Sequence, residues 1–231
     1  DENHYQPPYF RLMERLNLIG GDAAPRVMRP RRLALAELME LDFDHLVDVR
    51  DPLAYAAGHL SGAMNLPVGM ISSFAGWFIR EGERVALVGS DEDQLEMAKT
   101  YLSRIAIDNI AGGYVGVVPA AAQGKTMETI PTIGTDEVSK RLDAGRDGWT
   151  LLDVRDADER ASAAIEGSRH IYVGELNERH AELDKNKHYT LMCASGMRAT
   201  VAVGWLASRG FANLDIYLGS MGAWKSSGRA A

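Results

Sequence analysis

The stretch Leu46–Asp51, which reads LVDVRD, returns as LLDVRD at Leu151–Asp156. At the same spacing, Leu60–Gly62 (LSG) returns as Ile165–Gly167 (IEG). A repeat that keeps its register without gaps across some twenty positions is hard to obtain by chance. The chain therefore contains two tandem copies of one structural unit.

The repeat divides the chain into segments whose lengths fit two small domains. Near their ends we align Gly112–Tyr114 with Gly219–Met221. Between the copies, prolines and a glycine surround a run of alanines, which is typical of a linker. The expected segments are an N-terminal arm or linker (1–29), a first domain (30–118), a linker (119–129) and a second domain (130–231).

Composition narrows the class of protein. Hydrophobic residues make up 46% and charged residues 25%, as in ordinary globular proteins. The net charge of −7 argues against a nucleic-acid binder, and no apolar run is long enough to span a membrane. The single cysteine fits a reducing compartment, so we expect a cytoplasmic protein. The six histidines show no metal-binding spacing, so we expect no metal site in this chain.

Each copy alternates short apolar segments with helical ones. In the second copy, strands are expected at Trp149–Val154, Tyr189–Met192 and Leu214–Leu218, and a helix at Met197–Ser208 that ends before Gly210. Short apolar strands separated by helices predict an α/β fold, with a parallel sheet covered on both faces.

The sole cysteine, Cys193, lies where a strand runs into a helix, in the sequence Cys-Ala-Ser-Gly-Met-Arg. Parallel sheets place their sites at such strand ends. The main-chain amides before the helix attract anions and favour the thiolate over the thiol. Gly196 permits a positive φ, and Arg198 adds a fixed positive charge. A thiolate held this way can attack a sulfane sulfur and carry it as a persulfide. The alternative is a buried structural cysteine before an ordinary helix.

The first copy lacks this chemistry. Gly89 occupies the position of Cys193, and three acidic residues follow it in the segment 91–93. Their carboxylates would repel an anionic donor and cap the next helix instead. We therefore interpret the first copy as a catalytically inactive scaffold or recognition module.

Both copies keep an aspartate and an arginine at the end of the repeated strand, and in the second copy these are Asp153 and Arg155. A local ion pair or hydrogen bond that supports the fold is the favoured interpretation. A supporting role for Arg155 at the site is the alternative.

The repeated strand, the segment Gly58–Pro67 (GHLSGAMNLP) and the segment Gly219–Trp224 (GSMGAW) resemble rhodanese-homology domains, the sulfurtransferase family. The resemblance implies two tandem rhodanese-like domains, each a five-stranded parallel sheet with helices on both faces. It also implies that Cys193 is the catalytic nucleophile and that the loop Ala194, Ser195, Gly196, Met197 and Arg198 binds substrate. Cys193 to Arg198 is the loop length that the family associates with sulfur transfer; related phosphatases carry one residue more.

These features predict a sulfurtransferase that moves sulfane sulfur from thiosulfate or a persulfide to a thiol or cyanide. The alternative is a non-catalytic interaction or regulatory module. The arm from His4 to Met13 resembles the segment that joins a metallo-β-lactamase-like domain to rhodanese repeats in persulfide-metabolising fusion proteins. Any iron or zinc would then belong to that upstream domain, and we expect no cofactor in this chain.

Overall fold

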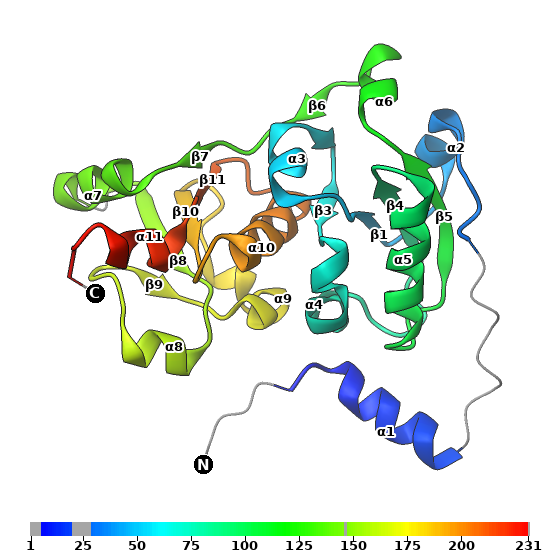
Figure 1. The fold of residues 1–231 in the computed structure, drawn as a ribbon, viewed down its shortest axis with the longest axis horizontal. Helices are drawn as coiled ribbons and strands as arrows, with labels where there is room; N and C mark the ends of the chain where they lie inside the picture. Colours follow the sequence, from blue (N-terminus) through cyan, green and yellow to red (C-terminus); the bar gives the residue numbers. More distant parts are fainter. Residues whose placement is uncertain (1–5, 20–28, 146, 231) are drawn as a thin grey trace. The chain divides into compact units, whose positions relative to one another are not determined.

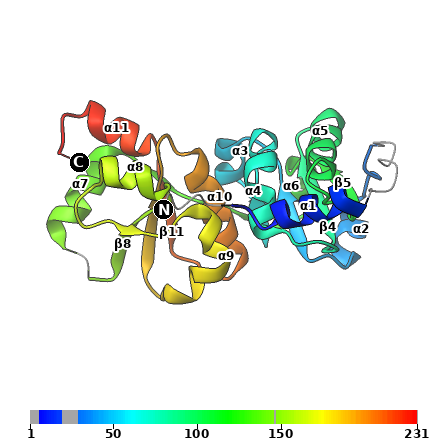
Figure 2. The ribbon, with the colours of Figure 1, turned by 90° about the horizontal axis from the view of Figure 1, so that it is seen from below.

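The computed structural model describes residues 6–19, 29–145 and 147–230, and Figures 1 and 2 show its ribbon. The described chain packs as two compact units. The first contains residues up to 51 together with 66–127, and the second contains 52–65 together with 128 onward. Of the predicted arm, residues 1–5 and 20–28 lie outside the described residues.

The first unit is built from helices and parallel strands in alternation. Its elements are α1 (Tyr9–Ile19), α2 (Leu35–Glu40), β1 (His45–Asp48), η1 (Val68–Met70), α4 (Ile71–Phe78), β4 (Val85–Gly89), α5 (Glu92–Ser103), β5 (Ile110–Val115) and α6 (Val118–Ala122). The short strand β6 (Met127–Glu128) follows.

The second unit follows the same alternation and includes a segment from the first copy. Its elements are α3 (Pro52–Ala57), β2 (His59–Leu60), β3 (Ala63–Asn65), β7 (Thr132–Ile133), α7 (Thr135–Ala144), β8 (Trp149–Asp153), α8 (Ala157–Ser162), β9 (Arg169–His170), η2 (Val173–Glu175), α9 (Leu176–Arg179), η3 (His180–Glu182), β10 (His188–Met192), α10 (Met197–Ser208), β11 (Leu214–Tyr217) and α11 (Ser220–Ser226).

The sheets confirm the predicted α/β class. Their strand orders are β3-β1-β4-β5 and β7-β11-β10-β8-β9, and the pairings within the second sheet are all parallel. Within the part of the chain that the structure describes, the second sheet has the five strands that the resemblance implied, whereas the first has four. Where a fifth strand would pair with β5, Arg32 forms a single bridge to Gly113. Helix α2 begins at Leu35, soon after this bridge, and so leaves little chain for further pairing.

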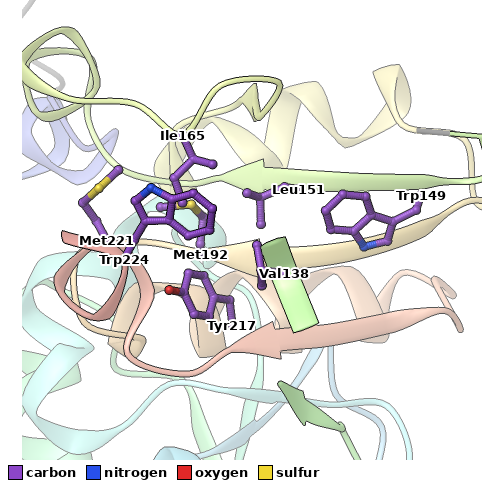
Figure 3. Close-up of a cluster of buried hydrophobic side chains, with 8 residues drawn as sticks. All are labelled: Val138, Trp149, Leu151, Ile165, Met192, Tyr217, Met221 and Trp224. Atoms are coloured by element: carbon purple, nitrogen blue, oxygen red, sulfur yellow. The ribbon is translucent and has the colours of Figure 1, made fainter. Parts of the chain in front are cut away.

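The core of the second unit explains why its central strands carry large apolar side chains. One face of the sheet carries a buried cluster with residues from α7 and α11 (Figure 3): Val138, Trp149, Leu151, Ile165, Met192, Tyr217, Met221 and Trp224. Helix α10 lies on the other side of the strands, as Figures 1 and 2 show. Every residue of α10 from Ala199 to Leu206 is buried, as expected for a helix without a polar face.

Helix α10 also packs closely on the segment 52–65. A Cβ placed on Gly204 would lie 2.3 Å from the main-chain nitrogen of Asn65 in β3. Glycine at this position therefore lets the helix touch the strand backbone. The same compact unit thus joins the helix of the second copy to a strand contributed by the first.

One sequence-based expectation is corrected by the strand pairings. Because the repeat aligns β4 with β10, the strand pairings set Gly113 at the position of Ile216. The alignment of Gly112–Tyr114 with Gly219–Met221 is therefore wrong, and the turn that corresponds to Gly219 is at Gly116. Both turn glycines have positive φ, +81° and +74°. In addition, the segment expected to be a linker begins within helix α6.

The described part of the arm forms helix α1, which has no buried residue. The hydroxyl of Tyr9 donates to the carbonyl of Ser72 at 3.3 Å, and Arg15 forms an ion pair with Glu81 at 2.6 Å. The Tyr9 ring lies so close to Gly76 in α4 that a Cβ there would be 2.1 Å from it. Helix α1 therefore packs on the first unit through one aromatic ring and one exposed ion pair. Among the described residues, no helix combines the length and apolarity needed to cross a bilayer.

Candidate active site

Cys193 follows directly after β10 and is almost fully buried, with 1% of its surface exposed. The main-chain N–H of Gly196 donates a hydrogen bond to its Sγ, with 3.1 Å between nitrogen and sulfur. Gly196 has φ +105° and precedes the first residue of α10. Only glycine adopts this conformation at little cost, and the positive φ that Gly196 was expected to permit is observed.

The helix that follows adds an electrostatic contribution. Gly196 precedes α10, so the first amides of the helix have no acceptor one turn earlier within it. These amides and the helix dipole favour negative charge at the helix start. The residues of the loop differ in solvent exposure: Ala194 is half-buried, whereas Ser195 and Met197 are exposed. The predicted substrate-binding residues thus form one turn that begins at the sulfur and opens to solvent.

Hydrogen bonds to the start of α11 hold the backbone of this turn in place. The hydroxyl of Ser220 accepts from the N–H of Cys193 at 3.1 Å and donates to the carbonyl of Tyr217 at 2.9 Å. The N–H of Met221 donates to the carbonyl of Cys193 at 3.1 Å. Ser220 has φ +49°, a left-handed conformation that non-glycine residues rarely adopt. The sequence analysis did not single out Ser220, although it lies in the segment Gly219–Trp224 that carried the resemblance.

Arg198 is not free to offer its charge to the turn. Its two terminal nitrogens donate to the two carboxylate oxygens of Glu159, and the Nη2–Oε1 distance is 2.7 Å. An oxygen of Asp156 lies 3.8 Å from Nη1. The sequence analysis assigned Arg198 as a positive charge of the loop and missed both carboxylates, because Glu159 is 39 residues away along the chain.

This pairing shifts the titration of the groups involved. The hydrogen bond from Arg198 lowers the pKa of Glu159 from 4.5 to about 2. The hydrogen bond from Glu159 in turn raises the pKa of Arg198, against the opposing effect of burial. Burial raises the pKa of Asp156. The guanidinium and the Glu159 carboxylate are therefore both charged over the whole neutral range.

The ion pair predicted between Asp153 and Arg155 is present and buried. Their side chains meet at 2.6 Å between Nη2 and Oδ2 and at 3.0 Å between Nε and Oδ1. Arg155 also donates to the carbonyls of Glu159, at 3.2 Å, and of Ala163, at 2.8 Å. Asp153 and Arg155 thereby tie the end of β8 to helix α8, the helix that carries Glu159. The first copy has the same pair in Asp48 and Arg50.

The corresponding turn of the first copy is filled by its own side chains. The carboxylate of Asp91 accepts from the N–H of Gln94 at 2.7 Å and caps α5, so the predicted capping is confirmed. A Cβ on Gly89 would lie 2.9 Å from Leu95 Cδ2. Leu95 thus occupies space next to the position where the second copy holds its thiol.

The acidic start of α5 is also paired within the first unit. Arg29 contacts Glu96 at 2.6 Å and Asp93 at 3.1 Å, and Arg32 contacts Glu92 at 2.7 Å. These carboxylates are exposed, so the pairs contribute little stability. They reduce the negative charge that the sequence suggested for this surface. Among the described residues, no group of three or more His, Cys, Asp or Glu side chains is arranged to hold a metal ion.

Comparisons with known proteins identify the family of this chain. Residues 33–118 and 134–227 each match the sequence profile of the rhodanese-like domain. The chain is 33% identical over 96 residues to "Putative sulfurtransferase YtwF" of Bacillus subtilis, a match that covers 42% of this chain and 91% of that protein. It is 30% identical over 100 residues to "Putative sulfur carrier protein YrkF" of the same organism, covering 43% of this chain and 54% of that protein.

Among solved structures, a rhodanese-related protein from Thermoplasma volcanium is 28% identical, with a TM-score of 0.39, and the match covers 42% of this chain and 93% of that one. None of these relatives bears on the resemblance of the arm to a metallo-β-lactamase fusion, which stays a prediction. The two profile matches together cover well over half of the sequence. The chain therefore belongs to the rhodanese-like domain family, with two such domains in tandem.

Proposed function

We propose that this chain is a sulfurtransferase in which Cys193 accepts a sulfane sulfur and passes it on. The observation that carries the proposal is the hydrogen bond from the Gly196 amide to the Cys193 sulfur at the start of α10. A donor amide and a helix start stabilise negative charge on this sulfur, and on a second sulfur bonded to it. Membership in the rhodanese-like family supports the same chemistry.

The reaction would proceed in two steps. The Cys193 thiolate attacks the sulfane sulfur of thiosulfate or of a persulfide. The S–S bond of the donor breaks, its electron pair leaves with sulfite or with the donor thiolate, and a new S–S bond forms on Cys193. A thiol or cyanide then attacks the outer sulfur, and the Cys193 thiolate leaves. Because this sequence contains one cysteine, an acceptor thiol must come from outside it, and the mechanism is of the ping-pong type.

The experiment is to treat the protein with a sulfur donor, remove the excess, and measure its intact mass before and after adding cyanide. We expect a gain of one sulfur atom that cyanide removes, and no gain in Cys193→Ser. The variant should unfold at the same urea concentration as the parent chain, because serine is close to cysteine in size. Loading of the variant equal to that of the parent would refute the proposal.

The second candidate is a recognition or regulatory module, within a larger persulfide-metabolising enzyme that carries a metallo-β-lactamase-like domain. The first copy favours this role, since Asp91 and Leu95 fill its turn. Under this alternative, no donor would load Cys193. We place either activity in a reducing compartment such as the cytoplasm, where a lone thiol stays reduced.

A further inference from the structure

The loop around Cys193 has a single cationic side chain, and its charge is already paired with carboxylates. Arg198 is the basic residue between Cys193 and the first turn of α10. Both of its terminal nitrogens donate to Glu159, and Asp156 adds a second carboxylate at 3.8 Å. The side chain of Arg198 is 18% exposed and that of Glu159 is 32% exposed, so water screens the pair only partly. The side chains at the turn therefore offer a donor no net positive charge.

The first copy provides an internal comparison. The repeat aligns Glu159 with Ala54 and Arg198 with Gln94. Both members of the ion pair are thus absent from the copy that also lacks the thiol. The buried pair of aspartate and arginine at the strand end is present in both copies, so it serves the fold. The pair of Glu159 and Arg198 differs from it in occurring only beside the cysteine.

This arrangement determines which donor charge the turn tolerates. Thiosulfate brings two negative charges to the Cys193 thiolate, whereas the reacting sulfur group of a small-thiol persulfide brings at most one. Like charges a few ångströms apart inside a protein repel appreciably, and main-chain amides supply partial charges only. A turn whose one guanidinium is neutralised should therefore penalise a dianion more than a monoanion.

We infer that Glu159 determines donor specificity: by occupying Arg198 it makes the Cys193 turn selective for persulfides of small thiols, whose reacting sulfur group carries at most one negative charge, over the thiosulfate dianion. This inference rests on the proposed function. Glu159 acts through Arg198 and is a positioning residue. The step it favours is attack of the Cys193 thiolate on the outer sulfur of R–S–SH, which forms the Cys193 persulfide and releases R–S⁻.

The test compares steady-state kinetics with glutathione persulfide and with thiosulfate as donors, using the same acceptor. For the parent chain we expect kcat/KM to be higher for the persulfide. In Glu159→Gln, Arg198 is released to bind the donor, so KM for thiosulfate should fall about tenfold, as expected for one regained charge contact. The turnover number and the KM for the persulfide should change little. Glu182→Gln, which removes a glutamate paired with Arg179 and Arg169 on the surface, is the matched control and should leave both donors unchanged.

Two further variants keep the inference testable if Glu159→Gln folds poorly. Asp156→Asn removes the second carboxylate and keeps a side chain that caps α8, so it should lower KM for thiosulfate in the same direction by a smaller factor. In Glu159→Gln combined with Arg198→Gln, the gain should disappear because the released charge is gone. An unchanged ratio of the two donors in Glu159→Gln and Asp156→Asn would overturn the inference. Failure of both donors to load the parent chain would instead refute the proposed function.

Discussion

Replacing Gly204 by alanine should destabilise the second unit strongly, against the usual trend for glycine in helices. In an exposed helix interior, glycine to alanine stabilises by about 1 kcal/mol. At Gly204 the new Cβ would lie 2.3 Å from the main-chain nitrogen of Asn65. A relaxed contact needs roughly 3.5 Å, so α10 and β3 must separate by about 1 Å.

The obstacle is backbone, and it cannot rotate away. Overfilling a packed core costs about 1–3 kcal/mol or more, and an overlap with main chain places this site at the upper end, about 3 kcal/mol, against a gain of about 1 kcal/mol in helix propensity. We therefore expect a net loss of about 2 kcal/mol in the free energy of unfolding, measured by urea denaturation. Because α10 begins at the Cys193 turn, sulfur loading of the folded fraction should also slow.

Gly76→Ala is the matched control. Its Cβ would also overlap a neighbour, at 2.1 Å, but that neighbour is the side chain of Tyr9 on helix α1. The ring can rotate, and α1 has no buried residue to lose. We expect a change of less than about 1 kcal/mol. If Gly204→Ala were as stable as the parent chain, the close packing of α10 on β3 would be disproved.

Two other outcomes follow from the contacts described. Gly89→Cys, made in a Cys193→Ser background, should acquire no persulfide, because Leu95 lies 2.9 Å from the new Cβ. Mass spectrometry checks this. A persulfide at position 89 would contradict the conclusion that the turn of the first copy is filled by its own side chains. The pKa of Glu159 is lowered from 4.5 to about 2 in the folded chain, so its ion pair with Arg198 stabilises fully above about pH 4.5 and is lost as the pH falls toward about 2. The destabilisation caused by Glu159→Gln should thus shrink between pH 6 and pH 3 in urea unfolding, by about 1 kcal/mol after screening, and a constant difference would rule out the pairing.

The features predictable from the sequence were those encoded locally. The repeated strand, the turn from Cys193 into a helix and the pair of Asp153 with Arg155 each depend on residues a few positions apart. The capping of α5 by Asp91 is local in the same sense. The positive φ of Gly196 could also be expected from the sequence, because glycine alone adopts such a backbone conformation at little cost.

The contacts that the sequence did not reveal join distant parts of the chain. Glu159 reaches Arg198 from helix α8, and Ser220 supports the Cys193 backbone from the start of α11. Neither partner can be found without knowing which strands are neighbours. The misaligned segment Gly112–Tyr114 has a related cause, since glycine occurs both in β5 and at the turns that follow the strands, and only strand pairing distinguishes them.

The burial of α10 has a consequence for how the site works. Eight consecutive residues of this helix, from Ala199 to Leu206, are shielded from solvent. A helix enclosed in this way cannot tilt or slide without opening the hydrophobic interior, which costs nearly as much as unfolding. The dipoles around the sulfur are consequently fixed before any donor arrives, and none of the binding energy is spent on arranging them. Evolution could then adjust the reaction by changing the exposed residues around the Cys193 turn alone, without altering the buried residues of α10.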